Sequence, residues 1–143
     1  MPDTLTLPRK DTPLVTIRLI DWTGPIVEVL FHRGFSTSAD VEELMHAVTA
    51  FVEEHIPAKD GHRAYFLTCY DHFAVPHDLA HPLQEAFLRF NRLYSKGDAR
   101  YGGTVVAQTL IISTAIRAQT PSEICATREE ALQHLRARIR DGD

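Results

Sequence analysis

The chain has 143 residues, of which 44% are hydrophobic and 24% charged, and these values are typical of a single globular domain. A net charge of −4 gives no reason to expect a nucleic-acid partner. The two cysteines, Cys69 and Cys125, are too few for a disulfide framework and lack the paired spacing of zinc ligands. No apolar run reaches the length of a membrane span, and residues 1–11 lack the apolar core of a signal peptide, so we expect a cytoplasmic protein that does not bind membranes.

The first elements expected are a lead-in and a hairpin. Residues 1–13 are polar and contain three prolines, which predicts a flexible lead-in to a single domain at residues 14–143. Residues 14–20 alternate between apolar and polar side chains, as a half-buried strand does. After a turn, residues 26–31 form a second and more apolar strand, so the two strands are expected to pair with each other.

A helix and a central strand are expected next. After Gly34 the apolar residues recur at helical spacing and form one stripe, which consists of Val41, Leu44, Met45, Val48, Phe51 and Val52. Thr37 or Ser38 can cap the start of this helix, and Pro57 marks its end. Residues 63–70 are an almost continuous apolar run, which predicts a strand that is covered on both faces.

A second helix is predicted to start at Pro82, if not slightly earlier. Its apolar stripe consists of Leu83, Phe87, Phe90 and Tyr94. Lys96 and Gly97 are expected to end it, because a cation followed by glycine is the usual C-terminal signal of a helix. Residues 99–103 are then expected to form a short strand.

The last third of the chain contains one ambiguous segment. Residues 104–119 are rich in β-branched side chains, as strands are, but they have the length of a helix, and we predict a helix. Residues 121–126 are expected to form the last strand, and Thr127 with Glu130 forms a capping box that opens the last helix. The predicted order is β-β-α-β-α-β-α-β-α, an α/β fold with a mixed, mainly parallel sheet covered by helices.

Three local features accompany this order. The strand-to-loop junction at Tyr70-Asp71 follows the first long helix, residues 99–103 precede another helix, and residues 124–132 are similar to the last strand and helix of uncharacterised bacterial SpoIIAA-like proteins. Over residues 14–139 the chain therefore resembles the SpoIIAA-like (STAS) domains, the family of the bacterial anti-sigma-factor antagonists. The resemblance implies the STAS fold and a role in protein–protein interaction.

The chain departs from that family at one important place. In the anti-sigma-factor antagonists the loop after this strand presents a serine that a partner kinase phosphorylates. Between Cys69 and Tyr94 this chain has no serine or threonine, so a switch that phosphorylates serine or threonine has no residue there to act on. The resemblance implies that Asp71, which opens the loop, caps the backbone.

A cluster of histidines provides an alternative hypothesis. His72, His77 and His81 lie close together in the sequence, and His77 and His81 would share one face of a helix. Histidines at such spacing can bind zinc if they converge on one point. The alternative function is therefore a small metal-dependent enzyme or metal sensor.

Other candidate residues follow from the expected topology. Ligands of such sheets bind at the carboxyl ends of parallel strands, which places Asp71, His72, Phe73 and Arg100 at the end where a ligand or partner surface is expected. Phe73 is a large apolar residue in a polar loop, so it either anchors the loop or is exposed as part of a contact surface. Gly103 precedes a helix whose N-terminus would suit a small anion. The chain contains no G-x-S-x-G, G-x-G-x-x-G or P-loop pattern, so neither a catalytic residue nor a cofactor is predicted.

The leading interpretation is a non-enzymatic regulatory or protein-interaction domain. Its partner would be another protein or a second copy of the chain, and a homodimer would form through the hairpin edge or an apolar helix face. A domain that binds a small molecule in an apolar pocket between helices and sheet is the remaining alternative.

Overall fold

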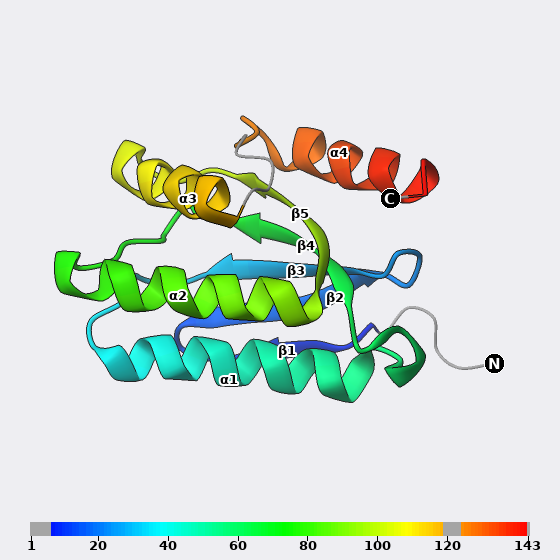
Figure 1. The fold of residues 1–143 in the computed structure, drawn as a ribbon, viewed down its shortest axis with the longest axis horizontal. Coiled ribbons are helices and arrows are strands. Elements are labelled where there is room, and N and C mark those ends of the chain that lie inside the picture. Colours follow the sequence, from blue (N-terminus) through cyan, green and yellow to red (C-terminus); the bar gives the residue numbers. More distant parts are fainter. Residues whose placement is uncertain (1–6, 119–123, 143) are drawn as a thin grey trace.

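The computed structural model describes residues 7–118 and 124–142 (Figure 1). Its elements in chain order are β1 (Arg9–Asp11), β2 (Val15–Asp21), β3 (Ile26–Phe31), α1 (Ser38–His55), the 3-10 turn η1 (Ala58–Asp60), β4 (Ala64–Cys69), α2 (His77–Tyr94), β5 (Ser95–Tyr101), α3 (Val105–Ala118) and α4 (Arg128–Arg140). The predicted α/β class is confirmed.

The five strands form one sheet in the order β1-β2-β3-β4-β5. β1, β2 and β3 pair antiparallel, so the predicted hairpin is confirmed, whereas β3, β4 and β5 pair in parallel. Two of the four pairings are thus antiparallel, and the sheet is evenly mixed rather than mainly parallel. β4 lies between β3 and β5, and its side chains enter both cores, Phe66 on one face and Tyr65 and Leu67 on the other, as expected of an apolar strand covered on both faces.

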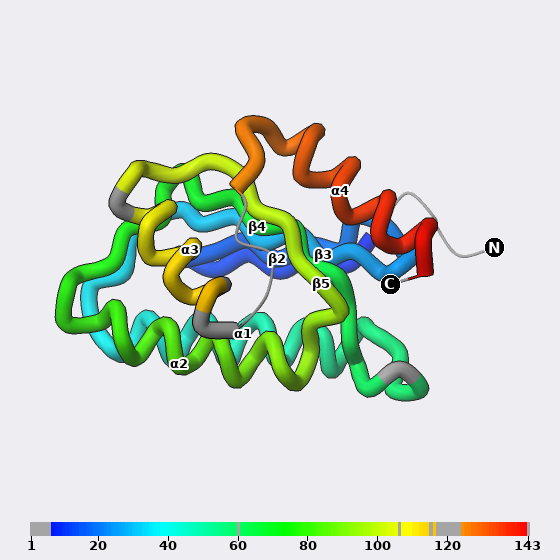
Figure 2. Tube along the Cα trace, turned by 45° about the horizontal axis from the view of Figure 1, so that its top comes forward, coloured from blue at the N-terminus to red at the C-terminus, as the bar shows by residue number. Residues whose placement is uncertain are grey.

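The helices divide between the two faces of the sheet. α1, α2 and α3 pack on one face, and α4 packs alone on the other (Figures 1 and 2). Side chains alternate between these layers: Val27 and Val29 of β3 belong to the core under α1 and α2, whereas Ile26 belongs to the core under α4. None of the described helices has the length and apolar content that crossing a lipid bilayer requires.

α1 begins where the sequence predicted, with Thr37 as an extended N-cap residue. The Asp40 carboxylate in the first turn accepts a hydrogen bond from the backbone N–H of Ser36 at 2.7 Å, and it pairs with the Arg33 guanidinium at 3.1 Å. The hydrogen bonds from Arg33 and Ser36 lower the pKa of Asp40 from 3.8 to about 2. The carboxylate therefore ties the preceding loop to the positive end of the helix.

The N-terminal segment differs from the prediction. Arg9–Asp11, which the sequence places in the flexible lead-in, form an edge strand in which Lys10 pairs with Ile17. Thr16 Oγ1 donates a hydrogen bond to Asp11 Oδ1 at 2.6 Å. The edge of β2 that does not pair with β3 provides the hydrogen-bond partners of this short strand. The residues within 1–13 alone do not predict this pairing, because its partner strand lies outside that segment.

The junction between α2 and β5 also differs. α2 begins at His77 and includes Pro82, and the chain passes from Tyr94 directly into β5, so the predicted helix end at Lys96 and Gly97 is wrong. A Cβ atom at Gly97 would lie 2.6 Å from the Arg138 guanidinium. The glycine lets an α4 side chain approach the strand, so it serves tertiary packing rather than a helix end.

The predicted last strand is reduced to one bridge. Cys125 pairs in parallel with Tyr101, Ile124 and Ala126 are not in a strand, and residues 121–123 lie outside the described residues. α3 confirms the helix predicted at 104–119, and Thr127 caps α4 by accepting a hydrogen bond from the backbone N–H of Glu130. Within the described ranges the order is β-β-β-α-β-α-β-α-α, which replaces the predicted order.

Candidate functional site

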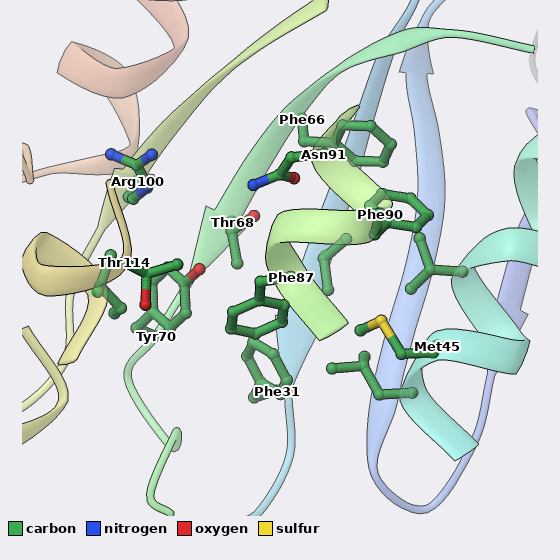
Figure 3. A pocket seen from close by; sticks show the side chains of 14 residues that line it. Phe31, Met45, Phe66, Thr68, Tyr70, Phe87, Phe90, Asn91, Arg100 and Thr114 are labelled. Atoms are coloured by element: carbon green, nitrogen blue, oxygen red, sulfur yellow. The ribbon is translucent and has the colours of Figure 1, made fainter. Parts of the chain in front are cut away.

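A pocket lies between the sheet and the three helices of its larger core (Figure 3). The cavity has a volume of about 70 Å³, which exceeds the roughly 10–15 Å³ that a single water molecule needs. Its wall is mostly apolar and includes Phe31, Met45, Phe66, Phe87, Phe90 and Ile111. An apolar cavity with a few polar groups is the usual form of a small-molecule site.

The polar groups of the pocket lie toward one side. Arg100, Thr114 and the hydroxyl of Tyr70 lie away from Met45, with Thr68 and Asn91 between them (Figure 3). They come from β4, β5, α2 and α3, and Tyr70 directly follows β4. The wall is therefore amphipathic, with an apolar end at α1 and a polar end beside β5 and α3.

Arg100 is the charged residue of this wall. Only 6% of Arg100 is exposed, and its Nη2 atom forms an ion pair with Asp98 Oδ1 at 2.7 Å. The two residues are two positions apart on β5, so their side chains leave the same face of the sheet. Burial raises the pKa of Asp98, and the nearby charges of Arg100 and Arg138 oppose that rise. Asp98 thus holds the guanidinium in place at the wall.

Tyr70 brings a hydroxyl to the same end. Burial raises the pKa of Tyr70, so the phenol remains protonated at neutral pH and retains an O–H donor. Its position is fixed from both sides, because its backbone N–H donates to the carbonyl oxygen of Tyr101 at 3.0 Å and its ring stacks on Phe31. The polar end is therefore preorganised by the sheet.

Phe73, expected at the ligand or partner surface, is instead buried. It is 1% exposed, and its ring centroid lies 4.9 Å from that of Phe31, 5.0 Å from that of Tyr70 and 5.7 Å from that of Phe35. Edge-to-face contacts of this kind stabilise aromatic clusters. Phe73 therefore anchors the loop between β4 and α2 to the core.

Asp71 and Gly103 meet, but as a structural cap. The backbone N–H of Gly103 donates to Asp71 Oδ1 at 3.2 Å, and a Cβ atom at Gly102 would collide with the same carboxylate oxygen. Gly102 and Gly103 have φ values of +78° and +97°, which glycine adopts far more readily than other residues. This contact ties the ends of β4 and β5 together.

The histidines are not brought together. Within residues 7–118 and 124–142 no three histidine, cysteine, aspartate or glutamate side chains are placed to hold a metal ion. His72, His77 and His81 are all exposed, and His81 lies 3.9 Å from Glu85 on its own helix. The structure thus gives the metal hypothesis no support.

Sequence reasoning missed a polar network on the opposite face of the sheet. The side chain of Glu28 is 0% exposed and accepts hydrogen bonds from Arg18 Nε at 2.8 Å and Arg128 Nε at 2.7 Å. The hydroxyl of Tyr101 donates a further bond at 3.2 Å. Burial raises the pKa of Glu28, but the bonds from Arg128 and Arg18 outweigh burial and leave the pKa below 4.5.

This Glu28 network is structural, because its carboxylate is shielded from solvent and joins β2, β3, β5 and the first residue of α4. The sequence held one signal for it. Arg18 and Glu28 are paired residues of the β2–β3 hairpin, so an arginine stands opposite the carboxylate that interrupts an apolar strand. The third partner, Arg128, is distant in sequence and gives no local signal.

Comparison of the chain with protein-family models, with curated proteins and with solved structures finds no match.

Proposed function

We propose that this chain is a small-molecule-binding domain whose ligand occupies the pocket between the sheet and α1, α2 and α3. The observation that carries the proposal is the amphipathic wall, in which an apolar cavity ends at the buried guanidinium of Arg100. The ion pair with Asp98 lets the charged guanidinium stay buried at the wall, and a few fixed polar groups in a mostly apolar pocket are what orient a bound ligand.

The pocket can be blocked without removing a core residue. Met45 lines it from α1 and is partly exposed, so Met45→Trp adds volume at the apolar end. His46→Trp places the same side chain at the adjacent exposed position and is the matched control. A thermal-shift screen of small amphiphiles is expected to find compounds that stabilise the wild type and His46→Trp but not Met45→Trp. A screen that raises the Tm of none of the three proteins, or of all three equally, contradicts the proposal.

Within this proposal the fold is the SpoIIAA-like one and the role is regulatory rather than enzymatic. The hairpin, the first long helix and the parallel pairing of β3 with β4 support the family proposal. The absence of serine and threonine from Cys69 to Tyr94 makes occupancy of the pocket, rather than phosphorylation, the signal we propose.

A second candidate function is self-association through α3. Val105, Ile112 and Ile116 are 79%, 36% and 65% exposed, and their spacing places them along one side of the helix. Apolar side chains gathered on one helix face favour docking to another protein surface, and the proposed occupant is a second copy of the chain. Sedimentation analysis is expected to show a dimer that Ile116→Glu dissociates and Gln133→Glu, an exposed substitution on α4, does not. A monomeric wild type at high concentration excludes this candidate.

A further inference from the structure

The polar end of the pocket narrows the class of ligand, and this step rests on the proposed function. The groups that line it are rich in hydrogen-bond donors. The Arg100 guanidinium can only donate, Tyr70 keeps its phenolic proton, and Asn91 contributes an amide group. The polar end therefore suits a group that accepts several hydrogen bonds.

The charges around Asp98 also favour a ligand group that is an anion. Asp98 has two cations near it, since Arg100 pairs with its carboxylate at 2.7 Å and Arg138 Nη1 donates to its backbone carbonyl oxygen at 3.4 Å. Arg100 contacts the carboxylate itself, whereas Arg138 contacts the backbone of Asp98 and acts on the carboxylate through its charge. A ligand anion that binds Arg100 leaves Asp98 with a second cation close by, so the exchange does not strand a buried negative charge.

From this geometry we infer that the ligand is a small monocarboxylic acid whose carboxylate binds the Arg100 guanidinium and the Tyr70 hydroxyl. Guanidinium and carboxylate form two parallel hydrogen bonds, and such charge-assisted bonds are roughly twice as strong as neutral ones. The hydrocarbon part of the acid points toward Met45 and the phenylalanines at the apolar end (Figure 3). The cavity of about 70 Å³ is about half the size of the roughly 150 Å³ cavity that holds a benzene ring, so it limits that part to a short aliphatic chain.

The test uses three probes that share one short hydrocarbon chain and differ in the polar group: butyrate, 1-butanol and butylamine. Their affinities for the wild-type protein are measured by calorimetry and by ligand-observed NMR. The acid is expected to bind about tenfold more tightly than the alcohol, and the amine more weakly than both. Equal affinities, or a preference for the alcohol or the amine, overturn the inference and leave the proposed function standing. Failure of all three probes to bind overturns the proposed function as well.

Two variants locate the acid within the pocket. Arg100→Gln alone leaves the Asp98 carboxylate buried without its ion pair, so it is combined with the isosteric Asp98→Asn, and the double variant removes both charges together. The double variant is expected to bind acid and alcohol equally, and Tyr70→Phe to weaken the acid alone. Arg92→Gln, an exposed change on α2, is the control and keeps the preference for the acid. A double variant that is folded by circular dichroism and still prefers the acid overturns the assignment to Arg100. The probe series on the wild type decides the ligand class even if the double variant does not fold.

Discussion

Replacing Glu28 by glutamine is expected to destabilise the protein strongly at neutral pH. The glutamine side chain keeps one oxygen acceptor but exchanges the other for an NH2 group, which faces a guanidinium N–H and cannot accept from it. The change leaves Arg18 and Arg128 without the negative charge that both of them pair with. The ion pairs that are lost lie where α4 joins the sheet.

The magnitude follows from the geometry of the Glu28 network. A buried hydrogen bond to a charged group contributes about 1.5–3 kcal/mol, and the substitution removes the bonds to one oxygen and weakens those to the other. The side chains of Arg18 and Arg128 are 36% and 39% exposed, so both regain part of their hydration and reduce the cost. We expect a loss of about 3 kcal/mol in the free energy of unfolding.

Urea unfolding measures this loss directly. With a slope of about 2 kcal/mol per molar urea, the midpoint of Glu28→Gln is expected about 1.5 M below that of the wild type at pH 7. Glu42→Gln, an exposed substitution on α1, is the matched control and is expected to shift the free energy by less than about 0.5 kcal/mol. A Glu28→Gln midpoint that coincides with the wild-type midpoint at pH 7 would refute the reasoning.

The same pair of proteins has a defined pH dependence. The pKa of Glu28 is lower in the folded state than its ordinary value of 4.5, so folding favours the ionised form. The stabilisation from Glu28 is therefore complete above that ordinary value, and it is lost as the pH falls through the lower folded-state pKa. The difference between wild type and Glu28→Gln should shrink on acidification below pH 4.5 and stay constant above it. A difference that grows in acid would contradict the assigned direction.

Three further predictions concern the loop ends and the histidines. Phe73→Ala removes the aromatic anchor of the loop between β4 and α2 and is expected to lower the free energy of unfolding by about 3–5 kcal/mol, whereas Phe73→Leu should lower it less. Equal urea midpoints for the two variants would show that the ring is not the anchor. Gly102→Ala places a methyl group against Asp71 at a φ of +78° and should cost at least about 1 kcal/mol, and a thermal unfolding curve identical to the wild type would contradict that contact. Elemental analysis of untagged protein dialysed against zinc is expected to show no stoichiometric metal, since the described histidines form no ligating group. One bound equivalent of zinc that His77→Ala abolishes would support the metal hypothesis instead.

Local patterns determined the elements that depend on nearby residues. The stripe from Val41 to Val52 predicted α1, and Thr127 with Glu130 predicted the start of α4, because helices and their caps are built from residues three or four apart. The hairpin of β2 and β3 was predictable for the same reason. Phe73 was recognisable as unusual, but whether it was exposed or buried depended on distant rings.

Tertiary structure decided the features that residues far apart in the sequence create. Lys96 and Gly97 carry the local signal of a helix end, yet the glycine makes room for Arg138, which arrives from α4. Glu28 and Arg128 are 100 positions apart, so no local pattern relates them. The proposed site depends most on such distant contacts, because Arg100 and the apolar wall come from six different elements. The hydrophobic periodicity of a sequence reports which side of each element is buried, but it does not report where the buried sides leave a space.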